Sequence, residues 1–259
     1  MSAVTISRPI ARPAPAGVRF SGLLNVEARK LVDTRSGAIL LAALPLAATA
    51  ILLAWVGYSD QPASWMELAS YATLAPSTFV PLLAILAVTA EWTHHTAMTT
   101  FALEPRRGRV LAAKLLVAVG LAVAMELVVY LLSGLVLAAG APARGWTPDW
   151  SFDANVFAGT LAGVILHVCV AVALALLFAN GPAALVTYLV GPTVILIVGA
   201  AGAWLAQATS WISLANAIDP VTSGDWAAID WGRLCSALAF WLLVPGAIGW
   251  VRQVRREIS

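Results

Sequence analysis

Long apolar stretches alternate with short polar connections along almost the whole chain. Six stretches are about 19 to 25 residues long, and at about 1.5 Å of helical rise per residue each can cross a hydrocarbon core of roughly 30 Å. They are Ala38–Val56, Tyr71–Ala90, Leu115–Leu137, Ala154–Phe178, Ala183–Leu205 and Trp231–Val251. The pattern predicts an all-α integral membrane protein with six transmembrane helices.

The segment before the first stretch is amphipathic. Its apolar residues recur at helical spacing, with polar residues on other faces: Phe20, Leu23, Leu24, Ala28 and Leu31 against Asn25, Glu27, Arg29, Lys30 and Asp33. We expect an interfacial helix over residues 20–36 that lies along the membrane surface, the alternative being a polar linker. Residues 1–19 are rich in Pro, Ala and Arg and predict a disordered cytoplasmic tail, which leaves residues 20–259 as a single transmembrane domain.

Composition and charge support this organisation and set its orientation. The chain has 61% hydrophobic and only 11% charged residues, with a mean hydropathy of +0.87. Of the 15 basic residues, all except Arg144 and Arg233 fall on one side of the predicted membrane. The positive-inside rule makes that side cytoplasmic, so both termini are expected inside the cell. The net charge of +2 gives no argument for nucleic-acid binding.

The chain lacks the motifs of the commonest catalytic sites. It has no GxxxxGK[ST] loop to hold the phosphates of ATP, and no HExxH sequence that would bind a catalytic metal. We therefore expect no enzymatic activity, cofactor or metal in this chain.

The connection Glu91–Lys114 is the most informative polar segment. It reads EWTHHTAMTTFALEPRRGRVLAAK, and its first half, Trp92–Leu103, is expected to form a short helix that Pro105 ends. Arg106, Arg107 and Arg109 then lie at the mouth of the third span. Anchoring by positive charge alone is the alternative, but it does not explain the order of Glu, Thr-rich helix and Pro-Arg-Arg.

This order of residues resembles a loop found in a known protein family. Glu91-x4-Thr96 followed by Glu104-Pro105-Arg106-Arg107-x-Arg109-x4-Lys114 resembles the first cytoplasmic loop of type V ABC exporter permeases, six-helix subunits that pair with a separate ATPase. The family pattern is roughly E-x3-GT, a Thr- or Leu-rich helix, P-x-R and a Lys that opens the third span. This chain has His95 where the family usually has Gly. The resemblance extends over the whole chain, including the outer segment Ala206–Asp230, where the family has two short re-entrant helices.

The resemblance implies specific partners and roles. It implies an ABC ATPase subunit that binds ATP and Mg²⁺, a second permease subunit in a homodimer or heterodimer, and export across the plasma membrane. The residues expected to couple the permease to the ATPase are Glu91, Thr96, Arg106, Arg107 and Arg109. The largely apolar spans favour a hydrophobic or amphipathic cargo such as a drug, lipid or peptide.

Two ionisable residues lie deep in predicted spans. Glu126 of the third span and His167 of the fourth fall at comparable depth near the midplane. Because a carboxylate there costs roughly 2.5 to 3.5 kcal/mol on insertion scales, the two side chains are expected to meet. Such a pair is either a hydrogen bond that fixes two helices or a proton-linked site.

Prolines interrupt four of the predicted spans, at Pro45, at Pro76 and Pro81, at Gly191-Pro192 and at Pro245. Each removes an intrahelical hydrogen bond and promotes a kink. In the family resembled, the first, second and fifth spans bound the substrate path, so the polar residues near these kinks are candidates to line a cavity: Ser77, Thr78, Thr187, Tyr188 and Thr193. Satisfying a carbonyl that a proline leaves free is the alternative role for each.

Two other functions remain open from the sequence. One is a proton-coupled secondary transporter that uses Glu126 and His167, and the other is a non-transporting membrane assembly subunit. Neither requires an ATPase.

Overall fold

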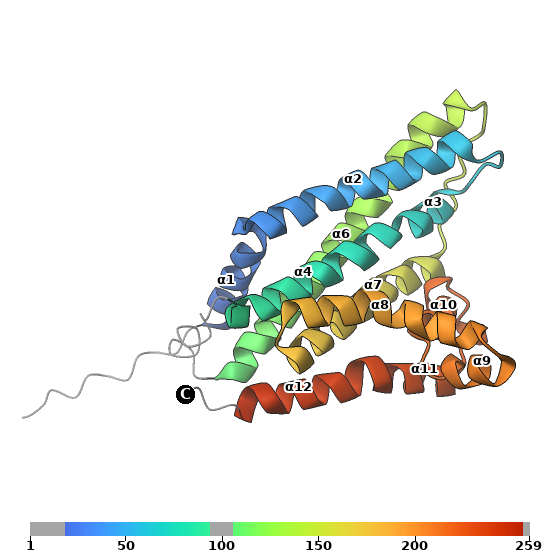
Figure 1. Ribbon diagram of the computed structural model, residues 1–259. Coiled ribbons are helices and arrows are strands. Elements are labelled where there is room, and N and C mark those ends of the chain that lie inside the picture. Colours follow the sequence, from blue (N-terminus) through green and yellow to red (C-terminus); the bar gives the residue numbers. More distant parts are fainter. Residues whose placement is uncertain (1–18, 94–105, 256–259) are drawn as a thin grey trace, which may run out of the picture.

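The computed structural model describes residues 19–93 and 106–255, and within these ranges the regular elements are helices and no strand forms (Figure 1). This confirms the all-α class. The helices are α1 (Phe20–Asp33), α2 (Arg35–Tyr58), α3 (Trp65–Ala72), α4 (Leu74–Thr93), α6 (Arg107–Ala143), α7 (Ala154–Phe178), α8 (Gly181–Ala200), α9 (Ala203–Ser210), α10 (Leu214–Thr222), α11 (Trp231–Leu238) and α12 (Val244–Arg255), with a 3₁₀ turn at Trp226–Ala228 and a π-helical segment at Ala239–Leu243.

Six of the helical segments in the described ranges are long and apolar enough to span a bilayer. They are Arg35–Tyr58, Trp65–Ala90, Gly108–Ala143, Ala154–Phe178, Gly181–Ala200 and Trp231–Val254. The six predicted membrane-spanning stretches are thereby confirmed, and the protein is a multi-pass membrane protein. The predicted tail, residues 1–19, lies outside the described residues except for Arg19.

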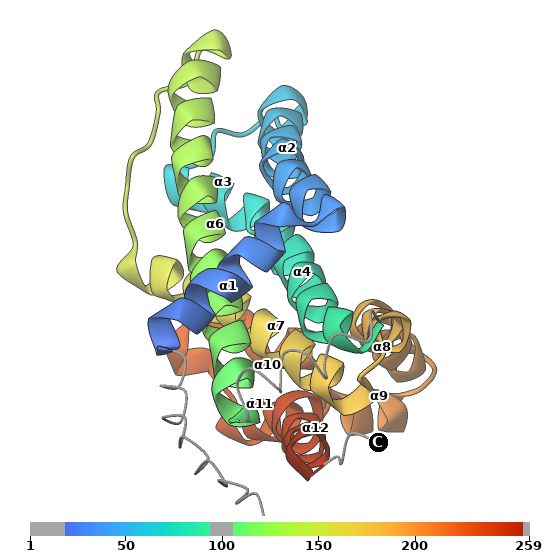
Figure 2. The ribbon, with the colours of Figure 1, turned by 90° about the vertical axis from the view of Figure 1, so that its left-hand side faces the viewer.

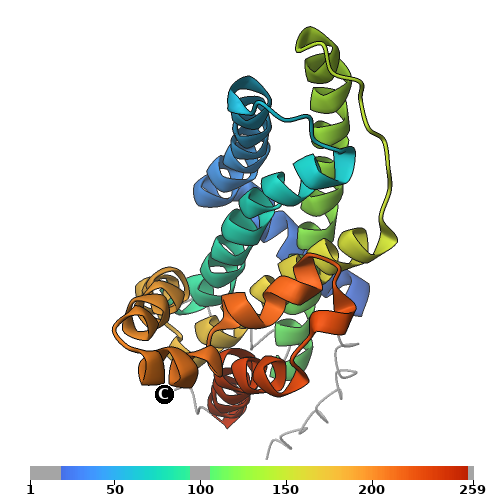
Figure 3. The same cartoon turned by 90° about the vertical axis from the view of Figure 1, so that its right-hand side faces the viewer.

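The fourth span, α7, is the centre of the helical bundle. It packs against α4 and α12, and also against α6, α8 and α10. Its C-terminal half carries an unbroken run of buried residues from Val170 to Leu176. By contrast, α2 and α8 are little buried, and they lie on either side of α4 on one face of the molecule (Figures 2 and 3).

Three predicted elements have boundaries that differ from those observed. The second span begins at Trp65 and is broken at Thr73, because Pro76 has no N–H to bond the carbonyl of Ala72. The fifth span was expected to reach Leu205 but ends at Ala200, and the separate helix α9 begins at Ala203. The interfacial helix α1 ends at Asp33, three residues before its predicted end, and Thr34 caps the start of α2 by accepting from the N–H of Gly37 at 3.1 Å.

The sixth span changes its helical winding before Pro245. The π-helical segment Ala239–Leu243 precedes this proline, whose ring nitrogen cannot bond the carbonyl of Trp241. The indole of Trp241 donates to the carbonyl of Ile212 at 2.8 Å, which ties the span to the connection before α10.

The segment between the fifth and sixth spans contains α9 and α10, and α10 packs against α7. Gly159 and Gly163 of α7 are buried there, and a Cβ at Gly159 would overlap the carbonyl of Val221. The two glycines, four residues apart, therefore allow α7 and α10 to pack closely. Figure 1 also shows α1 and the C-terminal end of α12 at the same end of the bundle, opposite α9, α10 and α11.

Candidate functional site

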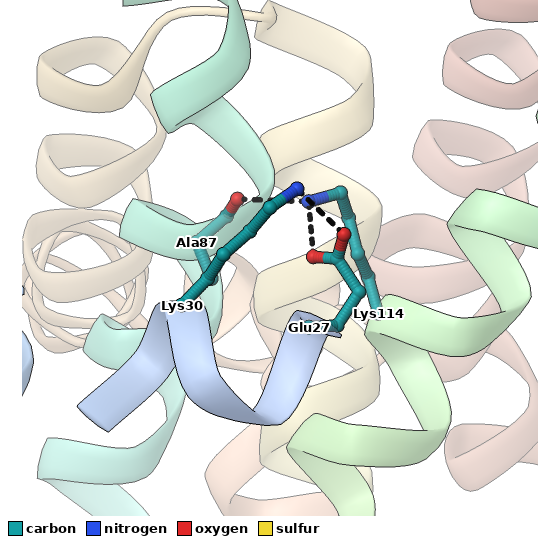
Figure 4. Close-up of polar contacts among 4 residues, drawn as sticks. All are labelled: Glu27, Lys30, Ala87 and Lys114. Atoms are coloured by element: carbon teal, nitrogen blue, oxygen red, sulfur yellow. Dashed lines mark hydrogen bonds and ion pairs between the residues drawn. The ribbon is translucent and has the colours of Figure 1, made fainter. Parts of the chain in front are cut away.

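A buried ion-pair cluster joins α1 to the bundle, next to the segment that connects α4 and α6. Glu27 of α1 contacts Lys114 of α6 through Oε2 at 2.6 Å and Lys30 through Oε1 at 2.7 Å (Figure 4). The ammonium of Lys114 also donates to the carbonyl of Ala87 in α4 at 3.4 Å. We call these four residues the Glu27 cluster.

The Glu27 cluster is almost completely shielded from solvent at its centre. The side chains of Glu27 and Lys114 are 6% and 3% exposed, whereas that of Lys30 is 42% exposed. Neighbouring side chains leave a void of only about 10 Å³ around the pair, too little for more than one water molecule. A buried carboxylate and ammonium each require the other, because either alone would be a desolvated charge. The cluster therefore fixes α1 to α6 and to the last turns of α4.

From the sequence we expected Glu27 on a polar face of helix α1, and this prediction is wrong. Glu27 lies four residues after Leu23 and four before Leu31, so it falls on the apolar side that packs against the bundle, where Leu31 is also buried. The spacing of four residues from Leu23 and from Leu31 could have indicated from the sequence that Glu27 is buried. Lys114 was expected only as the lysine that opens the third span.

The residues predicted to couple to an ATPase surround the segment 94–105, which lies outside the described residues together with Thr96 and most of the expected helix Trp92–Leu103. The predicted connection 91–114 is shorter than expected. Glu91 belongs to the last turn of α4, and α6 begins at Arg107. Arg106 is exposed immediately before α6, and Arg109 is half-buried in its first turn.

A cavity of about 210 Å³ lies between α4 and α8, and we call it the α4–α8 cavity. Four residues singled out from the sequence line it: Ser77 and Thr78 from α4, His167 from α7 and Tyr188 from α8. Apolar side chains and one indole complete the wall: Leu74, Val170, Leu189, Pro192, Leu214, Ala215 and Trp241. Leu74 and Leu189 are both exposed, so the cavity opens to the surface of the bundle between α4 and α8.

Tyr188 joins the two main walls of this cavity. Its hydroxyl donates to the carbonyl of Ser77 at 3.0 Å. That carbonyl has no intrahelical partner because Pro81, four residues later, has no N–H. Both roles considered for Tyr188 are therefore present, since it lines the cavity and satisfies a carbonyl freed by a proline.

The other two predicted cavity residues lie elsewhere on α8. Thr187 is half-buried and its hydroxyl donates to the carbonyl of Ala183 at 2.9 Å. Thr193 is exposed. Neither is among the residues that line the α4–α8 cavity.

Glu126 and His167 have separate partners, and no hydrogen bond or ion pair joins them in the described part of the chain. Oε1 of Glu126 lies 2.6 Å from Oγ1 of Thr73, at the break between α3 and α4. Nδ1 of His167 lies 2.8 Å from the carbonyl oxygen of Gly163, one turn earlier in α7. The expected pairing is not observed, because each side chain reaches a partner closer to its own position.

The ion-pair cluster and the cavity are connected by α4. Ala87 of the Glu27 cluster and Ser77 of the cavity are ten residues apart in this helix, a distance of about 15 Å at 1.5 Å per residue. In the described residues, no group of three or more His, Cys, Asp or Glu side chains is placed to hold a metal ion.

Comparison of the chain with protein-family models, with curated proteins and with solved structures finds no match.

Proposed function

We propose that this chain is the transmembrane permease subunit of an ATP-driven ABC exporter. The observation that carries the proposal is the Glu27 cluster, which clamps the interfacial helix α1 to both helices that flank the segment 94–105. The sequence of that segment and its flanks resembles the coupling loop of type V ABC exporter permeases. A subunit driven by a separate ATPase needs a firm connection between the surface that docks the ATPase and the helices that line the substrate path.

The helix α4 supplies the path from this surface to the cavity. Movement of the helix pair α4 and α6 at the Glu27 cluster would be transmitted about 15 Å along α4 to Ser77 and Thr78. Pro81 lies between the two ends and gives the helix a point at which it bends. ATP-driven closure of two ATPase subunits would use this bend to alternate access to the cavity.

The distribution of charge supports an orientation with the Glu27 cluster in the cytoplasm. The end of the bundle that holds the cluster also holds Arg106, Arg109 and Arg252, whereas the opposite end holds Arg144 and Arg233 among many acidic residues. With this orientation, both termini would lie in the cytoplasm, and we propose that α9 and α10 are the short re-entrant helices of the outer leaflet that the family resemblance implies.

The cavity supports a dimeric transport unit. At about 210 Å³ it is smaller than the roughly 300 to 1,000 Å³ of pockets that hold drug-sized ligands. It opens on the face formed by α2, α4 and α8, and a second permease subunit on this face would enlarge it. The apolar walls with a few hydroxyl and imidazole groups suit a hydrophobic or amphipathic cargo.

The separate partners of Glu126 and His167 give no support to a proton-coupled transporter built on this pair. A non-transporting assembly subunit would not need a polar cavity at the end of a coupled helix. We therefore retain the permease as the function that the geometry favours.

The test is to purify the tagged full-length chain from its own membrane in mild detergent and identify an ATPase in stoichiometric amount. Charge reversal at the predicted docking residues, Glu91→Lys or Arg106→Glu, should reduce ATPase association and ATP-dependent transport while membrane insertion stays intact. Arg233→Glu, at the other end of the molecule, is the matched control and should retain both. The proposal fails if no ATPase co-purifies, or if the docking variants assemble and transport normally.

A further inference from the structure

Glu126 occupies a position that neither the ion-pair cluster nor the cavity explains. It lies near the middle of α6 and is completely buried. Its Oε1 atom is 2.6 Å from Oγ1 of Thr73, a distance that fits a strong hydrogen bond between a carboxyl group and a hydroxyl. Thr73 is the single residue between α3 and α4.

The position of the Thr73 hydroxyl indicates where the proton of this contact resides. Oγ1 of Thr73 also lies 3.0 Å from the carbonyl oxygen of Ala69. A threonine hydroxyl has one hydrogen, and a carbonyl oxygen only accepts. If Glu126 were ionised, both neighbours of Oγ1 would be acceptors that compete for that hydrogen. If Glu126 carries a proton, it donates to Oγ1, and Oγ1 in turn donates to Ala69.

The surroundings of Glu126 also favour the neutral acid. In the described residues no Lys, Arg or His side chain forms a hydrogen bond or ion pair with it. Its second oxygen, Oε2, is buried without a hydrogen bond of ordinary geometry, although the hydroxyl of Thr160 on α7 also approaches the carboxyl group. That hydroxyl lies 2.8 Å from the hydroxyl of Tyr130 and donates to the carbonyl of Phe157 at 3.1 Å, while Nδ1 of His167 lies 2.8 Å from the carbonyl oxygen of Gly163. Leaving an ionised oxygen unpaired in this apolar interior is much more costly than leaving a neutral carbonyl unpaired.

The backbone at the break needs an external support. Pro76 cannot bond the carbonyl of Ala72, so the helical ladder is interrupted where α3 meets α4. Leu74, Ser77 and Thr78 follow the break directly and line the α4–α8 cavity. The direction in which α4 leaves the break therefore decides where these three side chains lie.

We propose that Glu126 is a neutral carboxylic acid that donates a hydrogen bond to Thr73 and thereby holds the break between α3 and α4 in the geometry that forms the cavity wall. Glu126 is in this sense a positioning residue that acts through Thr73. The inference does not rest on the proposed function, because it concerns the protonation and geometry of the chain itself.

Infrared difference spectroscopy of the purified full-length protein against its E126Q variant tests the protonation. We expect a carboxylic-acid carbonyl band at neutral pH that shifts in deuterated water and is lost in E126Q. The absence of a carboxylic-acid band attributable to Glu126, with a carboxylate band lost instead, would overturn the assignment.

Positioning is tested with a cysteine at Leu74, in a background where Cys169 and Cys235 are replaced by alanine. Its reaction rate with a thiol reagent should be unchanged by E126Q, whose amide also donates to Thr73, and altered by Thr73→Val, with Thr73→Ser restoring the original rate. An unchanged rate in Thr73→Val would refute the positioning role even if Glu126 is protonated.

Discussion

Removal of the ammonium of Lys114 is the most direct test of the Glu27 cluster. In Lys114→Met the carboxylate of Glu27 remains buried, with 6% of its side chain exposed, and loses a contact of 2.6 Å. Breaking a buried pair from one side costs about 3 to 5 kcal/mol of folding free energy. Because Lys30 still contacts Glu27 at 2.7 Å, we expect the lower end of that range, about 3 kcal/mol.

A double-mutant cycle separates the pair from the loss of packing. Glu27→Met should cost a similar amount, since it leaves Lys114 buried with the carbonyl of Ala87 as a neighbour. The double variant Glu27→Met/Lys114→Met should be close to wild type, because two apolar side chains of similar length replace two desolvated charges. With about 3 kcal/mol for each single variant and close to zero for the double variant, the expected coupling energy is about 6 kcal/mol, above the usual range of about 0.5 to 3 kcal/mol for residues in contact.

The assay is unfolding of the purified protein in mixed micelles with a rising fraction of denaturing detergent, followed by the fluorescence of its 11 tryptophans. The ion pair between Asp230 and Arg233 is the matched control, because its atoms are 3.2 Å apart but both side chains are about half exposed. Arg233→Met should therefore change stability by less than about 1 kcal/mol. A coupling energy between Glu27 and Lys114 that is no larger than the stability change of Arg233→Met would refute the claim that the buried pair fixes α1.

Three further variants test other contacts by the same unfolding assay. Tyr188→Phe removes the hydroxyl that donates to Ser77 at 3.0 Å and should cost about 1 to 3 kcal/mol, because the carbonyl it leaves is part-buried without a donor; no loss would mean that water replaces the hydroxyl. Gly159→Ala should destabilise by about 1 to 3 kcal/mol because its Cβ meets backbone of α10, whereas Gly120→Ala, where nothing lies within 4 Å, should be neutral or stabilising by up to about 1 kcal/mol; equal effects would contradict the close packing. Asn180→Ala removes the side chain that accepts from the first turn of α8 at 3.0 Å and should cost about 1 kcal/mol, with Asn180→Asp retaining most of the stability.

The sequence predicted the spans well because their signal is local. A run of about 20 apolar residues has few alternatives to a membrane-spanning helix. The breaks were predicted less well, since a proline only removes one hydrogen bond and leaves the outcome to its surroundings. Pro45 lies within the continuous helix α2, whereas Pro76 follows a break that divides α3 from α4.

The candidate site depends on contacts between residues that are far apart in the sequence. The pattern of hydrophobic and polar residues does not predict such contacts. Glu27 and Lys114 are 87 positions apart, and Thr73 and Glu126 are 53 apart. Depth in the membrane placed Glu126 and His167 at the same level, but depth alone does not give the direction in which a side chain leaves its helix. Of the five polar residues expected near the kinks, Ser77, Thr78 and Tyr188 line the cavity. Only Tyr188 bonds a carbonyl that a proline leaves without a donor, that of Ser77.

The prolines are unevenly distributed among the spans, and we therefore expect the spans to differ in stiffness. The helix α7 contains no proline and α6 contains only Pro142 near its end, whereas α2, α4, α8 and the sixth span each contain one in their interior. Since α6 and α7 pack against each other, they form a rigid frame around which the other spans flex. If the chain is the proposed permease, distances between spin labels on α6 and α7 should stay constant through its transport cycle, while distances from this frame to α4 and α8 change.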